Sequence, residues 1–213
     1  EKAYKDIIKV QENSPQSRMQ LAKFYSLVTR ENEAVKVYEA ILADQSDYAR
    51  ARYKLAEIYL GRKDLVKTKA EVEKLLSIND TDAEALMLSA RVKLQENKAD
   101  EAIKDLEEVL KKQPTLKTAL FYMTQSRLEL GQLDQARAFI GDLERYHPNY
   151  QRLGLLKIQA AFIANQPQSA LQEANLLIRK VSKGYAGDAA NRQELEELRV
   201  RGITARGLAS LQL

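Results

Sequence analysis

GQLDQARAFIGDLERYHP, residues 131–148, contains a turn, a run with regularly spaced apolar residues and a proline. Ala136, Ile140 and Leu143 are separated by steps of four and three residues, which places them on one face of an α-helix. Pro148 cannot continue a helix, because proline lacks the backbone N–H and its ring clashes with the preceding turn. The stretch therefore predicts a turn at Gly131 followed by an amphipathic helix that ends before Pro148.

The same pattern recurs along the chain at a constant step of 34 residues. A small residue opens the second helix of each repeat, and this series is Ala34, Thr68, Ala102, Ala136 and Ala170. The step also reproduces a small or medium residue in the preceding helix, at Ala22, Ala56, Ala90, Thr124 and Ile158. The register continues without an insertion from Ser17 to Ser182, and a constant period of this length is typical of a repeat protein.

Each repeat contains two helices, because apolar residues have helical spacing on both sides of each internal turn. A single helix pair cannot bury its apolar face alone, so neighbouring pairs stack and share one core. The sequence thus predicts an all-α solenoid of stacked antiparallel helix pairs.

A 34-residue helix-turn-helix period with these anchors resembles the tetratricopeptide repeat family. The first repeat matches the family pattern best, with Leu21, Ala22, Tyr25, Ala34 and Tyr38. At the position of the family's large aromatic residue, this sequence has Arg18 and Arg52 in the first two repeats. The resemblance implies a right-handed superhelix whose concave face is lined by the first helix of each pair.

The periodicity also divides the chain. Residues 1–15 are interpreted as the second helix of a truncated preceding repeat, and residues 16–182 as five tandem repeats. Residues 183–213 are interpreted as a linker followed by the extended first helix of a further repeat. The apolar residues of that final helix are Leu195, Leu198, Ile203 and Leu208.

Two parallel rows of side chains follow the first helices at the repeat step. The apolar row is Met19, Tyr53, Met87, Phe121 and Leu155, and the polar row four residues further is Lys23, Glu57, Arg91, Gln125 and Gln159. One interpretation is a groove for an extended peptide or an amphipathic helix, with apolar anchors beside polar contacts. The other is packing between adjacent first helices, and periodicity alone does not separate the two. Of the positions used by the family's carboxylate-binding members, only Lys23 fits, so that mode of binding is not expected.

A basic patch is the second candidate site. It consists of Arg50, Arg52, Lys54, Arg62, Lys63, Lys67, Lys69 and Lys74. These cations favour an anionic partner such as an acidic peptide or an envelope polysaccharide. Interleaved acids make nucleic acid a poor candidate, and the favoured interpretation is a solvated helix face with Lys67–Glu71 and Lys69–Glu73 pairs.

Composition gives little support to catalysis. The 213 residues include no cysteine and one histidine, and the formal net charge is +4. The histidine, His147, precedes Pro148 at a helix end, where a local role is expected. Neither a metal site nor a cofactor motif is found, and no stretch reaches the roughly 18 consecutive apolar residues of a membrane span.

The predicted function is a non-enzymatic scaffold for a protein or peptide partner, with possible self-association through open solenoid ends. The alternatives are a scaffold for an anionic polymer and an accessory region of a larger protein. The location, cytoplasmic or bacterial periplasmic, stays open.

Overall fold

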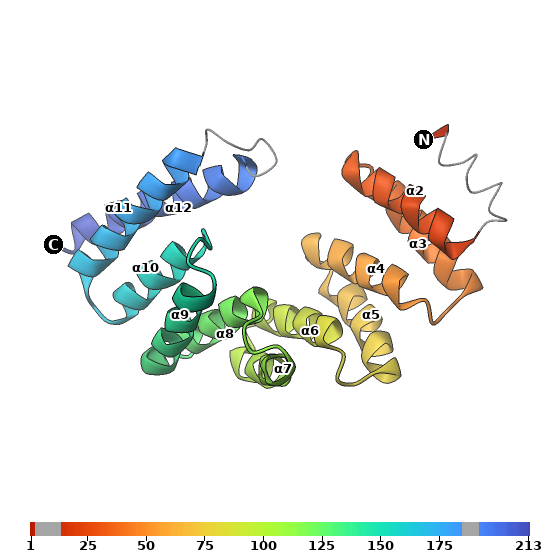
Figure 1. Ribbon diagram of the computed structural model, residues 1–213, viewed down its shortest axis with the longest axis horizontal. Coiled ribbons are helices and arrows are strands. Elements are labelled where there is room, and N and C mark those ends of the chain that lie inside the picture. Colours follow the sequence, from red (N-terminus) through yellow and green to blue (C-terminus); the bar gives the residue numbers. More distant parts are fainter. Residues whose placement is uncertain (3–13, 185–191) are drawn as a thin grey trace. The chain divides into compact units, whose positions relative to one another are not determined.

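The computed structural model describes residues 1–2, 14–184 and 192–213. Within these ranges the regular secondary structure consists of eleven α-helices, labelled α2 to α12, and contains no strand (Figure 1). The all-α prediction is therefore confirmed. The chain comprises two compact units, Glu1–Glu96 and Asn97–Leu213. The helix expected in residues 1–15 lies largely outside the described residues.

Unit 1 contains α2 (Pro15–Leu27), α3 (Glu31–Asp44), α4 (Ala49–Gly61), α5 (Leu65–Ile78) and α6 (Ala83–Gln95). Helix α2 packs against α3 and α4 packs against α5, which gives the expected pairs. Successive pairs are stacked, because α3 packs against α4 and α6 packs against both α4 and α5.

Unit 2 continues this pattern. Its helices are α7 (Ala99–Lys112), α8 (Lys117–Glu129), α9 (Leu133–Tyr146), α10 (Leu153–Ile163), α11 (Pro167–Gly184) and α12 (Arg192–Leu211). Each helix packs against the next, and α10 also contacts α8 and α12. The solenoid of stacked helix pairs is thus present within each unit.

Helix boundaries follow local chemistry. The side chains of Ser14, Asp64 and Asp82 each accept a hydrogen bond from a backbone N–H in the first turn of α2, α5 and α6, respectively. These N-caps satisfy amide groups that have no partner inside the helix. Pro15 occupies the first turn of α2, where its missing N–H costs nothing.

The turn inside every helix pair has the same backbone geometry. One residue in each turn has a positive φ, at the repeat step: Thr29 (59°), Lys63 (60°), Asn97 (60°), Gly131 (68°) and Asn165 (54°). This left-handed conformation is free of strain for glycine, is tolerated by asparagine and is unfavourable for a β-branched threonine. The repeat therefore imposes one turn geometry on four different residue types.

The small residues of the repeat lie where helices approach closely. Ala22, Ala56, Ala90 and Thr124 are fully buried, and so are the residues that open each second helix. The buried hydroxyl groups of Thr68 and Thr124 donate 2.8 Å hydrogen bonds to the carbonyl oxygens of Asp64 and Leu120. The predicted core registers are thereby confirmed.

The last helix differs from the prediction. Its buried residues are Leu195, Leu198, Gly202, Ala205 and Ala209. The expectation that Ile203 and Leu208 share this apolar face is wrong, since they are 39% and 52% exposed. The small residues on α12 permit close contact with α11: a Cβ at Gly202 would lie 3.1 Å from Ile178 Cγ1.

Candidate functional site

Unit 1 contains a groove of about 470 Å³, here called the unit-1 groove. Helices α2 and α4 provide most of its lining, and α3 contributes Tyr38. The lining residues are Gln16, Met19, Gln20, Lys23, Ser26, Leu27, Tyr38, Tyr48, Arg50, Lys54, Glu57 and Ile58. It therefore includes three members of the two predicted rows, Met19, Lys23 and Glu57.

Apolar side chains form the floor of the unit-1 groove. Met19, Tyr48 and Ile58 are partly buried and pack against the core of the first helix pairs. Leu27, at the end of α2, is 74% exposed. The floor therefore presents apolar surface that a bound apolar side chain would remove from water.

The charged side chains of the unit-1 groove are mostly cations. Lys54 Nζ lies 2.7 Å from Glu57 Oε2, and this hydrogen bond is the main cause of the raised pKa of Lys54. Burial raises the pKa of the neighbouring Glu84 on α6, and repulsion from Glu57 adds to it. Within the described residues, Lys23 and Arg50 have neither an ion pair nor a side-chain hydrogen bond. The groove lining thus has three cations and a single carboxylate, which is already bonded.

A second groove, the unit-2 groove, has a volume of about 580 Å³ and lies on α8, α10 and α12. It contains four of the predicted residues, Phe121, Gln125, Leu155 and Gln159. The other lining residues are Tyr122, Arg152, Leu156, Ile158, Phe162, Ile163, Arg201, Thr204, Ala205 and Leu208. The exposed Leu208, which the sequence placed in the core, therefore belongs to this groove.

An aromatic pocket of about 670 Å³ adjoins the unit-2 groove and shares Phe121, Tyr122 and Arg152 with it. The ring of Phe121 meets the rings of Tyr122 and Tyr150 edge to face, with centroids 5.2 Å and 5.7 Å apart. Lys117 Nζ lies 5.3 Å from the centroid of Tyr150. Burial raises the pKa of Tyr150 to about 12. These contacts hold Phe121 in place between the pocket and the groove.

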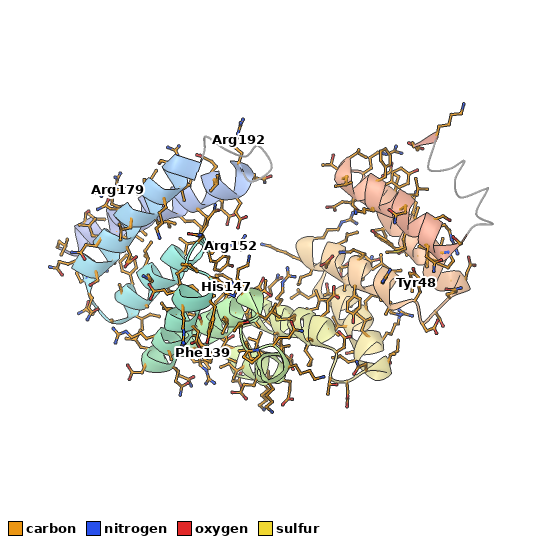
Figure 2. All side chains as sticks on the ribbon, in the orientation of Figure 1. Tyr48, Phe139, His147, Arg152, Arg179 and Arg192 are labelled. Carbon is orange, nitrogen blue, oxygen red and sulfur yellow. The ribbon has the colours of Figure 1, made fainter. Side chains whose placement is uncertain are left out.

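His147 and Arg152, both labelled in Figure 2, have local partners. His147 Nε2 lies 2.6 Å from the carbonyl oxygen of Thr115, which can only accept, so this nitrogen donates. Arg152 Nε donates to Glu194 Oε1 at 2.7 Å. Among the residues that the structure describes, no group of three or more metal-binding side chains is present. The histidine therefore ties the end of α9 to the preceding inter-repeat loop.

Three members of the predicted rows, Tyr53, Met87 and Arg91, line neither groove. Tyr53 packs against a core cluster that includes Leu60, Val72 and Leu88. Burial, reinforced by the neighbouring Asp82 carboxylate, raises the pKa of its hydroxyl. The apolar row is therefore divided between groove lining and packing.

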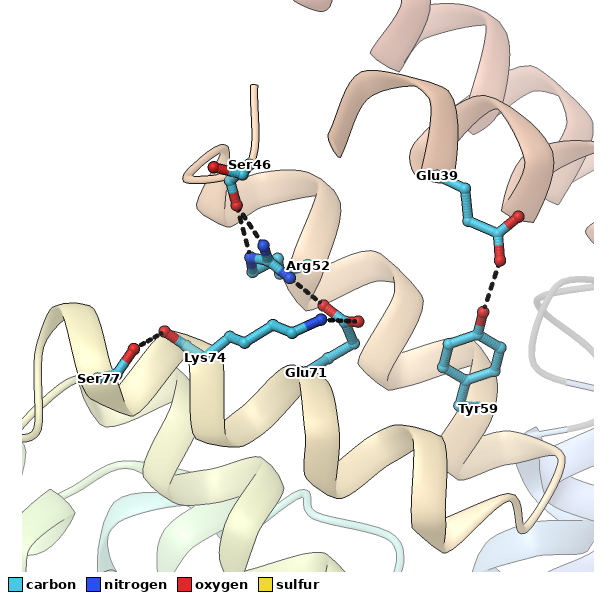
Figure 3. Close-up of polar contacts among 7 residues, drawn as sticks. All are labelled: Glu39, Ser46, Arg52, Tyr59, Glu71, Lys74 and Ser77. Carbon is cyan, nitrogen blue, oxygen red and sulfur yellow. Dashed lines mark hydrogen bonds and ion pairs between the residues drawn. The ribbon is translucent and has the colours of Figure 1, made fainter. Parts of the chain in front are cut away.

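Arg52 is an interior residue and not part of a surface patch. It is 8% exposed, and its guanidinium donates to Glu71 Oε2 at 2.6 Å and from Nε to the Ser46 carbonyl at 3.0 Å (Figure 3). Lys74 also reaches Glu71, at 3.3 Å. The expectation that Arg52 belongs to an exposed basic patch is wrong, because the repeat uses this arginine in place of a large core residue.

The remaining patch cations are mostly paired, but not as predicted. In place of the expected Lys67–Glu71 and Lys69–Glu73 pairs, Lys67 pairs with Asp64 at 3.7 Å and Lys69 pairs with Glu96. Arg62 pairs with Glu31 at 3.3 Å. Of the eight patch cations, Arg50 and Lys63 alone have no ion pair or side-chain hydrogen bond in residues 1–2, 14–184 and 192–213. The patch is therefore largely neutralised by acidic residues within it and on neighbouring helices.

Sequence reasoning missed several groove residues. Tyr48 and Tyr150 occupy one repeat register, as do the exposed Leu27 and Ile163, and all four line a groove or the aromatic pocket. The 34-residue step alone did not mark these positions, because the repeats between them have Gly61, Gln95 and Glu129 in one register and Asp82 in the other.

The comparisons agree with this architecture. The family model described as tetratricopeptide repeat matches residues 30–92 and 93–160, which is more than half of the chain. The chain therefore belongs to the tetratricopeptide repeat family. Proteins of this family are in general non-catalytic scaffolds for protein interaction. A search of curated proteins found no match.

Several solved structures share the fold at low sequence identity. PilW, a widely conserved type IV pilus biogenesis factor, is 19% identical with a TM-score of 0.74, over 93% of this chain and 91% of that one. A tetratricopeptide repeat protein from Parabacteroides merdae ATCC 43184 is 14% identical with a TM-score of 0.70, over 94% and 75% of the two chains. YrrB, described as a tetratricopeptide protein with an unusual peptide-binding site, is 17% identical with a TM-score of 0.64, over 84% and 92%. Among the described helices, none is both long and apolar enough to cross a membrane.

Proposed function

We propose that this chain is a non-enzymatic scaffold that binds a peptide or helix of a partner protein in the grooves between its first helices. One observation carries the proposal: the unit-2 groove brings together Phe121, Gln125, Leu155 and Gln159 from two successive first helices. Apolar anchors beside amide groups suit a peptide, since apolar contacts supply affinity and amides fix the register.

Exposed apolar side chains support this proposal. Ile163 and Leu208 are 41% and 52% exposed, and both line the unit-2 groove. An exposed apolar groove with a polar rim is typical of an interaction site. The fold similarity to YrrB is consistent with a peptide ligand, and the geometry of this chain is the main support.

The alternative of an anionic polymer on the basic patch has less support, because most of its cations are already paired. Among the residues that the structure describes, no cluster of metal-binding side chains supports an enzymatic role, and the single histidine is bonded to a backbone carbonyl. The function as an accessory region of a larger protein is compatible with peptide binding.

The test is a selection of peptides from a random display library on the full chain, followed by affinity measurement. We expect Phe121→Ala to weaken peptides selected in the unit-2 groove by about 30-fold, equivalent to about 2 kcal/mol for a buried anchor. Val66→Ala is the matched control, because Val66 is 80% exposed and lines neither groove.

Circular dichroism of each variant checks that helicity is unchanged. The proposal is contradicted if selected peptides bind equally well to wild type, Phe121→Ala and Met19→Ala. If heparin displaced all selected peptides, and salt also released them, the result would instead favour the anionic polymer as ligand.

A further inference from the structure

We propose that the unit-1 groove binds an amphipathic helix of a partner protein whose apolar stripe is flanked on both sides by acidic residues. This inference rests on the proposed function and adds the charge pattern of the partner. Charge complementarity between the groove and its occupant carries it.

The two walls of the groove each provide a cation. Lys23 projects from α2, and Arg50 and Lys54 are one helical turn apart on α4, so they share a face. Lys23 and Arg50 have no ion pair within the described part of the chain. An occupant that places a carboxylate against each wall gains two ion pairs without breaking an existing one.

The floor between these cations is apolar. Met19, Tyr48 and Ile58 pack on the core below, and the exposed Leu27 lies at the end of α2. A polyanion without apolar groups would leave this surface in water, whereas the stripe of an amphipathic helix covers it. The lining thus selects for both charge and apolar area.

The unit-2 groove lacks this charge pattern. Its two cations are already paired: Arg152 lies 2.7 Å from Glu194, and Arg201 lies 3.5 Å from Glu197. Its polar row consists of the amides Gln125 and Gln159. Preference for acidic flanks is therefore expected in unit 1 and not in unit 2.

The experiment uses three fluorescein-labelled synthetic helices with the same leucine stripe. The first has glutamates flanking the stripe, the second has lysines there, and the third has the same glutamates on the face opposite the stripe, with glutamines at the flanks. Fluorescence anisotropy measures binding to the full chain. We expect the first helix to bind at least about tenfold more tightly than the other two, a difference of about 1.4 kcal/mol.

The decisive variant carries Lys23→Glu and Arg50→Glu. We expect it to lose about tenfold or more in affinity for the glutamate-flanked helix and to gain affinity for the lysine-flanked one. The matched control carries Lys63→Glu and Lys104→Glu, which changes the net charge equally at two exposed lysines outside the groove. We expect its affinity for the glutamate-flanked helix to stay within about twofold of wild type at physiological salt, because neither lysine lines the groove and exposed charges are screened by salt.

Three results would overturn the inference. The first is equal binding of all three helices, with Met19→Ala weakening each of them; this leaves the proposed function intact. The second is full competition by polyglutamate, which would make the groove a polyanion site. The third is failure of all three helices to bind while library-selected peptides do bind. Failure of the proposed function itself is distinct, because selected peptides would then ignore both Met19→Ala and Phe121→Ala.

Discussion

The two grooves occupy equivalent parts of the repeat and differ in chemistry. In the polar row, the unit-1 groove has the charged Lys23 and Glu57, whereas the unit-2 groove has the amides Gln125 and Gln159. In the apolar row, unit 1 has the flexible Met19, whereas unit 2 has Phe121 held by two edge-to-face aromatic contacts. The repeat therefore places a groove at equivalent positions in both units, and the residues in two surface registers give each groove its own chemistry.

A similar contrast exists at the repeat position where the family has its large aromatic residue. Arg18 and Arg52 fill it in the first two repeats, each with a carboxylate partner, Asp44 and Glu71, at 2.6 Å. In the later repeats the position holds the buried Leu86, in unit 1, and Leu120 and Gly154, in unit 2. A Cβ at Gly154 would lie 3.1 Å from Leu177 Cδ1, so the second helix occupies that space. The first two repeats thus use an ion pair at this position, whereas the later repeats use apolar packing.

The largest effect that tests this contrast is expected from Arg52→Ala. Removing the arginine leaves Glu71, whose side chain is 12% exposed, without its closest partner. We expect unit 1 to lose about 3 kcal/mol of unfolding free energy, the lower end of the cost of breaking a buried ion pair. Hydrogen exchange resolved by peptide measures the loss in α4 and α5 separately from unit 2.

Replacing both partners, as Arg52→Met with Glu71→Leu, is the control. We expect it to recover most of the lost stability, since an apolar pair of similar volume is often neutral. A loss below about 1 kcal/mol for Arg52→Ala would instead place the arginine among ordinary surface ion pairs.

The second prediction exchanges anchors between the grooves. Phe121→Met should weaken unit-2 ligands by about tenfold, because a methionine is not held by the two edge-to-face contacts and loses more side-chain freedom when a ligand binds. Met19→Leu in unit 1 should change affinity by less than about threefold, since it conserves volume and makes no such contacts. Titration calorimetry with one selected peptide for each groove measures both. Equal losses would remove the distinction between a rigid and a flexible anchor.

The third prediction concerns alkaline pH. Tyr59 donates a 3.0 Å hydrogen bond to Glu39, and burial together with this carboxylate raises the pKa of Tyr59 to about 12 (Figure 3). Its pKa is higher in the folded state than the ordinary value of about 10. The protonated Tyr59 therefore makes its full contribution to the free energy of unfolding below about pH 10, and this contribution is lost as the pH rises to about 12. The loss is about 1–3 kcal/mol, because each unit of difference between the folded and unfolded pKa is worth about 1.4 kcal/mol.

Tyr59→Phe should flatten this part of the pH profile of unit 1. Chemical denaturation of wild type and variant between about pH 9 and pH 12 measures it. Tyr150→Phe is the comparison in unit 2, where burial alone is the leading cause of the raised pKa. Identical profiles for wild type and Tyr59→Phe would show that this hydroxyl does not control alkaline stability.

The smallest effect is expected in the turns. Thr29 has a φ of 59° in unit 1, whereas the equivalent residue in unit 2 is Gly131 at 68°. We expect Thr29→Gly to stabilise the chain by about 0.5 kcal/mol and Gly131→Ala to destabilise it by about 1 kcal/mol, because left-handed backbone favours glycine. Thermal unfolding measures both. A destabilising Thr29→Gly would mean that the Thr29 side chain contributes more than its backbone strain costs.

The fold was predictable because every repeat encodes it again. The core registers at Ala22, Ala34 and Ile41 recur at each step, so one misleading residue could not hide the pattern. Groove residues were predicted in part: Met19, Lys23, Phe121 and Leu155 line grooves, but Tyr53 packs on the core.

The rest depended on contacts that periodicity does not encode. Arg52 has the sequence properties of a surface cation, and its burial follows from Glu71 on the next helix and the Ser46 carbonyl. The apolar face of α12 is set by the small residues Gly202, Ala205 and Ala209, which a search for large apolar residues does not detect. Contacts between side chains on different helices are therefore the part of the structure that the repeat pattern does not predict.

The most direct test of the central claim is hydrogen exchange of the full chain with and without the glutamate-flanked helix. Binding in the unit-1 groove predicts new protection in α2 and α4, at residues 15–27 and 49–61. Protection in α8 and α10 should stay unchanged, because the cations of the unit-2 groove are already paired. Protection confined to α10 and α12, or equal in both units, would contradict the assignment of different chemistries to the two grooves.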